Sequence, residues 1–243
     1  LYAEDPDNDF LPATGTLDLY REAADGPGRR VDSGVAEGDT VSPFYDPMLG
    51  KLIAWGENRE EARLRLLAML DETAVGGVRT NLAFLSRVVG HRAFAEAELD
   101  TGFIPRHESE LLRPAGELSD AFWQQAAECF IRSEPTTVRD DDAHSPWSRC
   151  SGLRFGMPAQ VSLHLQCNGE SRRLKVDPAA QQPNARSPWA IRQGDALYLQ
   201  WNCEWLAVRA FDPIAEAEAG QQQHGGLTAP MNGSIVRVLV EPG

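Results

Sequence analysis

Few residues of this chain have the types and spacing that enzyme chemistry requires. The histidines form no H-x-H or H-E-x-x-H pair, so we expect no metal site. The acidic run Asp140–Asp142 with nearby His144 could hold a cation, but an acidic run in a loop is usually just solvated. The sequence has no G-x-S-x-G elbow and no Cys-His-Asn grouping, which argues against a nucleophilic hydrolase. The histidines are His91, His107, His144, His164 and His224.

Consecutive arginines, Arg29 and Arg30, follow the turn-forming residues Gly26-Pro27-Gly28. Arginine stays charged and offers several N–H donors in a planar fork, so it suits the stabilisation of a developing anion. Taken alone, Arg30 would be an ordinary surface charge at the edge of a strand. The sequence also lacks the motifs of an ATP-binding site: it has no Gly-rich phosphate loop, no metal-binding Glu pair near an Asn, and no nucleotide lysine.

Bulk composition limits the classes of protein that the chain can belong to. Its 243 residues predict one or two domains, and 42% apolar residues are enough for a packed core. The 36 acidic residues outnumber the 23 basic ones, which argues against a nucleic-acid partner. No apolar run approaches the roughly 18 residues of a membrane span, so we expect no membrane partner. The cysteines are scattered without a C-x-x-C pair and indicate a reducing compartment: Cys129, Cys150, Cys167 and Cys203.

The first part of the chain predicts a mixed α+β unit. Short strands between Pro-Gly and Asp-Pro turns are expected over residues 15–20, 30–34 and 51–55. Asn58 as N-cap, with Glu61 three residues later, predicts the start of a helix that ends at Gly76-Gly77. A second helix is expected over 81–89. Two amphipathic helices after strands indicate helices on one face of a sheet.

The second part predicts a helix followed by antiparallel strands. After a polar hinge over 108–117, Ser119 caps a helix that runs to Arg132, and apolar residues cover most of its circumference. Such a helix is surrounded by protein. From residue 161 the apolar period is two, and Asn168-Gly169 is a strong hairpin signal. Further strands over 174–176, 189–192, 196–201 and 205–211 indicate an antiparallel barrel or sandwich.

The last sixteen residues, TAPMNGSIVRVLVEPG, predict a strand without a partner. Valines 236, 238 and 240 share one face, and the chain then stops after Glu241-Pro242-Gly243. An isolated apolar strand would be an aggregation hazard. We therefore expect it to belong to a domain that lies mostly outside this chain, joined by a polar linker over 215–224.

Several sequence runs resemble the biotin-containing α subunits of acyl-CoA carboxylases, most closely those of the 3-methylcrotonyl-CoA type. These runs are Leu1–Pro6, Val31–Gly34, Pro43–Met48, Phe211–Ala215 and Ala229–Ile235. The resemblance implies three regions: residues 1–107 as the C-terminal region of biotin carboxylase, 108–222 as the subunit-interaction domain, and 223–243 as linker and first strand of a biotinyl carrier domain. It also implies the fold, an α+β unit followed by an antiparallel β-barrel built around a helix.

The resemblance also implies cofactors and partners. Biotin would be attached to a lysine in a Met-Lys-Met motif, which this sequence lacks, and ATP with Mg²⁺ or Mn²⁺ would bind an ATP-grasp core upstream. The partner would be a carboxyltransferase β subunit in a hetero-oligomer. The whole subunit would be a ligase of leucine degradation, cytoplasmic in bacteria or in the mitochondrial matrix of eukaryotes, whereas this piece alone would be inactive.

Three residues acquire expected roles from the resemblance. The family's biotin-contacting arginine falls on Arg30, which would stabilise negative charge on the ureido oxygen of biotin. Asp46 resembles a residue near the family's dimer interface, although a turn Asp before Pro47 is at least as good an alternative. Trp123 lies on the helix that the barrel strands would wrap, in the unit that binds the carboxyltransferase. A purely structural docking module, and the equivalent part of a propionyl-, acetyl- or geranyl-CoA carboxylase, remain alternatives.

Overall fold

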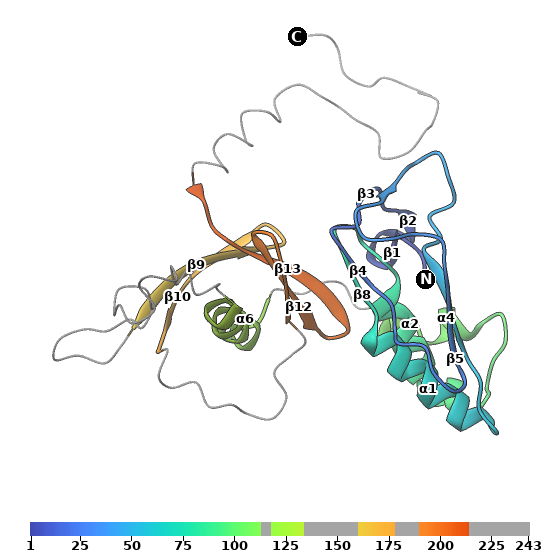
Figure 1. Cartoon of the computed structure of the whole chain (residues 1–243). Coiled ribbons are helices and arrows are strands. Elements are labelled where there is room, and N and C mark those ends of the chain that lie inside the picture. Colours follow the sequence, from blue (N-terminus) through green and yellow to red (C-terminus); the bar gives the residue numbers. More distant parts are fainter. Residues whose placement is uncertain (113–117, 134–159, 178–189, 214–243) are drawn as a thin grey trace, which may run out of the picture. The chain divides into compact units, whose positions relative to one another are not determined.

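A computed structural model describes residues 1–112, 118–133, 160–177 and 190–213 (Figure 1). The first of these ranges forms one compact unit, and the other three form a second. Three expectations lie outside the described residues: the terminal strand of 223–243, the linker over 215–224, and the acidic run with His144. Each unit is described by itself.

The first unit combines short antiparallel strand pairs with helices. Among its described residues the pairs are β1–β2, β3–β6, β4–β8 and β5–β7. The strands are β1 (Glu4–Asp5), β2 (Leu11–Pro12), β3 (Gly15–Thr16), β4 (Leu19–Arg21), β5 (Arg29–Ser33), β6 (Thr40–Val41), β7 (Gly50–Ala54) and β8 (Ala74–Gly76). The helices are α1 (Arg59–Glu72), α2 (Leu82–Gly90), α3 (Arg92–Ala95), α4 (Phe103–Arg106) and α5 (Glu108–Leu111), with a 3-10 turn at Pro6–Asn8. This confirms the mixed α/β character expected from the sequence.

Helix α1 begins as the capping residues predict and ends earlier than expected. Asn58 Oδ1 accepts a hydrogen bond from the Glu61 amide at 2.9 Å, as an N-cap side chain does. The helix stops at Glu72, and Thr73 Oγ1 donates to the Met69 carbonyl at 2.8 Å. The prediction that Gly76-Gly77 ends the helix was wrong, because residues 74–76 form the buried strand β8 paired with β4.

The end of the first unit is a small helical core. Phe84, Ala93, Phe103 and Leu111 are buried together, and they come from α2, α3, α4 and α5 in turn. The polar hinge expected over 108–117 was therefore wrong in its first part. Leu111 is fully buried, since α5 turns it into this core.

The second unit consists of helix α6 (Asp120–Ser133) packed against one antiparallel sheet. Ser119 Oγ accepts from the Phe122 amide at 3.2 Å, so the expected cap is in place. The sheet order is β10-β9-β13-β12-β11. Asn168 and Gly169 both have positive φ in the turn between β9 and β10, which is the conformation that the predicted hairpin requires. The strands are β9 (Val161–Cys167), β10 (Glu170–Val176), β11 (Ala190–Gln193), β12 (Ala196–Trp201) and β13 (Glu204–Ala210).

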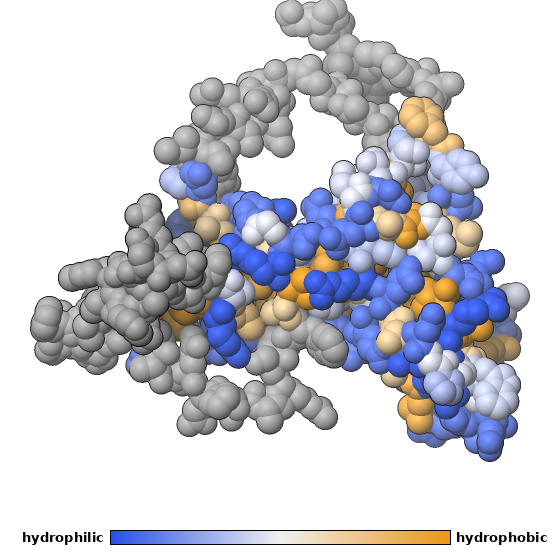
Figure 2. All heavy atoms as spheres, in the orientation of Figure 1, coloured by the Kyte–Doolittle hydropathy of each residue, from blue (hydrophilic) through white to orange (hydrophobic). Residues whose placement is uncertain are grey.

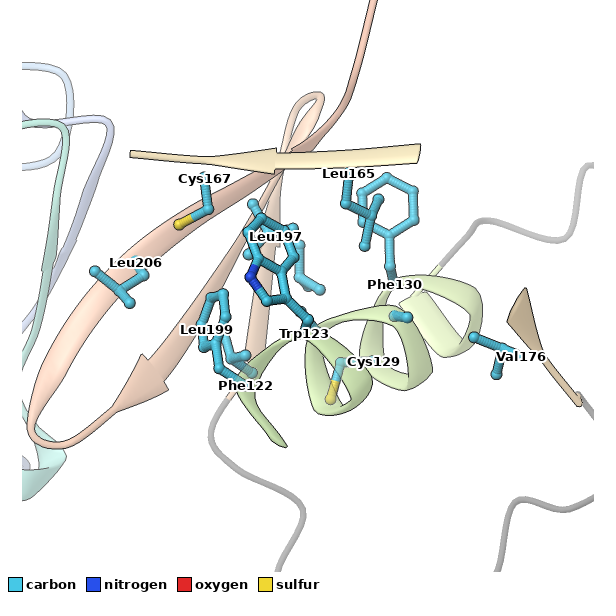
Figure 3. Packing of buried hydrophobic residues seen from close by; sticks show 13 residues of the cluster. Phe122, Trp123, Cys129, Phe130, Leu165, Cys167, Val176, Leu197, Leu199 and Leu206 are labelled. Carbon is cyan, nitrogen blue, oxygen red and sulfur yellow. The ribbon is translucent and has the colours of Figure 1, made fainter. Parts of the chain in front are cut away.

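The core of the second unit lies between α6 and this sheet. Figure 3 shows Trp123 projecting from α6 toward strands that carry Leu197 and Cys167. Within the described strands, β10 and β11 are the two edges, so this part of the sheet is open. The helix is buried against strands as expected, and closure of the strands into a barrel stays a prediction.

In the described part of the chain, no helix combines the length and the apolarity that a membrane crossing needs. In Figure 2 the described residues on the visible face are mostly hydrophilic, with hydrophobic residues in smaller groups between them.

Candidate functional site

The candidate site lies on the outer face of the β5–β7 strand pair. In the antiparallel register, Arg30 is opposite Ile53, and Val31 is opposite Leu52. Successive side chains of a strand point to opposite faces. Arg30 is therefore on the exposed face and its neighbour Arg29 on the face that packs against the protein.

The two consecutive arginines have different environments. Arg29 Nη2 contacts Glu72 Oε2 of helix α1 at 2.5 Å, and its side chain is only 20% exposed. Arg30 is 68% exposed, and its Nη2 donates to Asp32 Oδ2 at 2.8 Å along the same strand face. Of the two, only Arg30 presents its guanidinium to a molecule arriving from solvent.

The turn before β5 is fixed by backbone contacts at Gly28. Its carbonyl accepts from the Trp55 amide at 2.8 Å, and its φ is +73°, a conformation that favours glycine. A Cβ at this position would lie 2.7 Å from the Trp55 carbonyl oxygen and would clash with Arg65 Nη1. Arg65 itself donates to that carbonyl oxygen and pairs with Glu61 of α1 at 2.6 Å. Helix α1 thereby holds the end of β7 and the start of β5 in place.

A shallow hollow of about 230 Å³ lies beside Arg30. It is lined by Gly28, Arg29, Arg30, Ile53 and Trp55. Trp55 is 64% exposed and Ile53 39%, so an apolar wall stands next to a cationic fork. Pockets that enclose a whole small molecule usually measure about 300–1,000 Å³. This hollow is smaller and open, so it can hold only part of a ligand unless another surface covers it.

The structure gives Asp46 a local role in a turn. Its Oδ1 accepts from the Met48 amide at 2.9 Å, which is the hydrogen bond of an Asx turn. The turn leaves Phe44 and Tyr45 among the most exposed large side chains of the described residues. Burial and the nearby Asp46 carboxylate both raise the pKa of Glu4. The alternative reading of Asp46 as a turn former therefore has direct support, and its place near an interface stays a prediction.

Trp123 is not on any surface. It is 1% exposed within the second unit's core, so it cannot itself touch a partner subunit, and any effect on assembly must pass through the fold. The Cys129 thiol lies in the same core, and burial raises its pKa. A protonated buried thiol is unreactive, in line with the inert cysteines expected from the sequence.

The fold also brings together residues that the sequence analysis did not combine. His91 Nε2 lies 3.3 Å from Glu110 Oε2, and His107 Nδ1 lies 4.0 Å from Glu110 Oε1. His107 and Glu110 have the i,i+3 spacing of neighbours on one helical turn, which is a local signal for their proximity. His91 lies 19 residues before Glu110, so no local pattern indicates its contact with the other two.

Comparison with known proteins matches residues 1–106 to the biotin carboxylase C-terminal domain. The mitochondrial methylcrotonoyl-CoA carboxylase subunit alpha of Arabidopsis thaliana is 48% identical over 184 residues, covering 70% of this chain and 25% of the relative. The Mus musculus counterpart is 34% identical over 281 aligned residues, covering 100% of this chain and 39% of the relative. The mitochondrial propionyl-CoA carboxylase alpha chain of Homo sapiens is 42% identical over 206 residues, covering 79% of this chain and 27% of the relative.

A solved structure of the biotin carboxylase subunit of pyruvate carboxylase also matches, with 31% identity and a TM-score of 0.45 over 46% of this chain and 25% of that chain.

This chain therefore contains, in residues 1–106, the biotin carboxylase C-terminal domain of biotin-dependent carboxylases. More particularly, its relatives include methylcrotonoyl-CoA carboxylase α subunits at 34% to 48% identity. The chain spans only a quarter to two fifths of the length of these relatives, from 25% to 39%.

Proposed function

We propose that this chain supplies two parts of an acyl-CoA carboxylase α subunit of the 3-methylcrotonyl-CoA type. The first unit would complete the biotin carboxylase domain, and the second would hold the carboxyltransferase subunit. The observation that carries the proposal is the domain match over 1–106, together with an alignment to a methylcrotonoyl-CoA carboxylase α subunit that continues through the second unit. The acyl-CoA itself would be chosen by the partner subunit.

The residues around Arg30 fit part of a biotin ring system. Biotin accepts a carboxyl group on a ureido nitrogen, and charge develops on the ureido oxygen as that nitrogen loses its proton. Arg30 would donate its N–H groups to that oxygen, while Ile53 and Trp55 offer apolar surface beside it. A charge-assisted donor of this kind acts most strongly where water is excluded. The open hollow therefore implies that a further part of the biotin carboxylase covers it during reaction.

ATP with Mg²⁺ or Mn²⁺ would bind outside this chain. The sequence holds no Gly-rich phosphate loop and no nucleotide lysine, so its residues do not fit that group. We expect the 243-residue chain to show no bicarbonate-dependent ATP cleavage, with or without free biotin. A phosphate-release assay with this chain as its only protein would test this. Turnover above the buffer blank that disappears when the chain is heated would contradict the proposal that ATP binds outside this chain.

The second unit would be the docking part of the subunit. Its helix is buried against the sheet of described strands, and we propose that the complete sheet closes around α6 into a barrel. The outer face of that barrel would carry the binding surface for the carboxyltransferase.

The docking proposal has a direct test. We expect the chain to co-elute in size-exclusion chromatography with the β subunit of a methylcrotonoyl-CoA carboxylase, at a defined ratio. The β subunit of a propionyl-CoA carboxylase is the control for the type of carboxylase, because the chain is also similar to the propionyl-CoA carboxylase α chain. Separate elution from both β subunits, with a folded chain by circular dichroism, would rule out the docking role.

The relatives compared above are mitochondrial, so a eukaryotic source would place this chain in the mitochondrial matrix and a bacterial one in the cytoplasm.

A further inference from the structure

We propose that His91, His107 and Glu110 bind a divalent transition-metal ion, with Zn²⁺ as the best match. These three side chains lie at the helical end of the first unit, apart from the residues placed at the biotin site. One ligand atom from each, two imidazole nitrogens and a carboxylate oxygen, lies within 4.8 Å of the other two. The proposal is independent of the carboxylase function, since it rests only on this cluster.

One edge of the cluster has the length of an edge in a tetrahedral site, and a second edge is somewhat longer. Zn–N and Zn–O bonds of about 2.0–2.2 Å place neighbouring ligand atoms roughly 3.3–3.5 Å apart. His91 Nε2 is 3.3 Å from Glu110 Oε2, so this edge already has the required length. His107 Nδ1 is 4.0 Å from Glu110 Oε1, and a small rotation of the exposed Glu110 side chain would close that edge.

The surroundings hold the two imidazoles while leaving the carboxylate free to adjust. The His91 and His107 side chains are 13% and 24% exposed, whereas Glu110 is 63% exposed. The ring of Phe103 packs against both imidazoles, with centroid distances of 5.6 Å and 5.1 Å. Arg87 Nε donates to the Leu111 carbonyl at 2.7 Å and ties α5 to α2. Two ligands are therefore positioned before any ion arrives, which lowers the ordering cost of binding.

The donor set selects the class of ion. Imidazole suits Zn²⁺, Cu²⁺ and Ni²⁺, whereas Mg²⁺ and Ca²⁺ prefer oxygen ligands. Two histidines and one carboxylate leave a fourth position for water in a tetrahedral Zn²⁺ site. The cluster would thus discriminate against the Mg²⁺ that accompanies ATP.

Ion binding has an identifiable cost at His91. Its Nδ1 accepts from the Ala93 amide at 3.2 Å and caps α3, so the proton of the neutral ring sits on Nε2, where it can be donated to Glu110. Coordination through Nε2 moves that proton to Nδ1 and removes the cap. Loss of a cap costs about 0.5–2 kcal/mol of helix stability. A Zn²⁺ ion that links the ends of three helices can offset this cost, because its binding free energy becomes folding free energy.

The test measures binding of the metal alone to the 243-residue chain. After treatment with a chelator and removal of it, the chain is titrated with ZnCl₂ by isothermal titration calorimetry in the presence of a phosphine reductant. We expect one saturable site, and a visible ligand-field band when Co²⁺ replaces Zn²⁺. Changing even an outer-shell partner of a metal ligand typically weakens binding about 10- to 100-fold. His107→Gln and Glu110→Gln, which remove ligands themselves, should weaken it by at least as much.

Two further variants keep the result interpretable. His91→Asn removes the imidazole but retains an N-cap acceptor, so it should lose the ion without unfolding α3. His164→Gln changes a histidine of the second unit, which stacks on Phe211, and should bind Zn²⁺ like the parent. The proposal is overturned if the parent shows no saturable site. It is equally overturned if His107→Gln binds as tightly as the parent, because the ion would then be held by cysteines or other groups.

Discussion

The substitution Arg30→Ala is expected to lower biotin carboxylation about 10²–10³-fold without unfolding the protein. Removing one preorganised donor to a developing oxyanion costs about this much in other enzymes. The fold should be unaffected because Arg30 is 68% exposed and, among the described residues, its ion pair is with the exposed Asp32. Surface changes of this kind usually stay within about 0.5 kcal/mol. The measurement is bicarbonate-dependent ATP cleavage with free biotin, in a subunit that joins this chain to its ATP-grasp part.

The controls separate a local role from a general charge effect. Arg92 also makes an exposed ion pair, with Glu96 at 2.8 Å, and it does not line the hollow, so Arg92→Ala removes an equivalent charge and should leave activity unchanged. Arg30→Lys should recover little, because a point charge cannot reproduce the planar fork of donors. Normal turnover in Arg30→Ala would show that the arginine is an ordinary surface charge. The chain would then be a docking module in which biotin does not use this face.

Local patterns predicted those elements whose partners lie nearby in sequence. The strand expected after Gln193-Gly194-Asp195 is β12 at Ala196–Trp201, with the bounds predicted, and Asn168-Gly169 forms the hairpin turn between β9 and β10. Asn58 caps α1 because a cap depends only on the next few residues. In each case the information that fixes the structure lies within one element or one turn.

The errors arose where long-range contacts decided the structure. Strand β8 replaced the expected end of α1 because it pairs with β4, which is far away in sequence. Residues 108–111 form helix α5 in place of the expected hinge, because Leu111 packs into the core with Phe84 and Phe103. The exposure of Arg30 was expected from its place at the edge of a strand, but the hollow beside it depends on Trp55, which follows another strand. The contact between His91 and Glu110 likewise exists only once α5 has packed against α2.

Trp123→Ala is expected to destabilise the second unit by about 3–5 kcal/mol, the usual loss for a large buried aromatic. Trp123 is 1% exposed, packs edge-on against Phe122 at 5.4 Å, and lies in a core shared by α6 and the sheet. Truncation would leave a cavity that rigid strands cannot fill. Urea unfolding followed by circular dichroism would measure the loss, because the substitution removes a fluorophore, and the transition of the second unit must be resolved from that of the first.

Trp123→Phe provides the matched variant. Among the described residues Trp123 Nε1 is buried without a hydrogen-bond partner, so phenylalanine removes an unsatisfied N–H while keeping an aromatic ring. The free energy of unfolding should therefore fall much less in Trp123→Phe than in Trp123→Ala. If α6 organises the docking unit, co-elution with the carboxyltransferase subunit should weaken in Trp123→Ala and persist in Trp123→Phe. An alanine variant that is as stable as the parent and still co-elutes would place α6 at the periphery, because a helix at the centre of the unit cannot lose its largest side chain without effect.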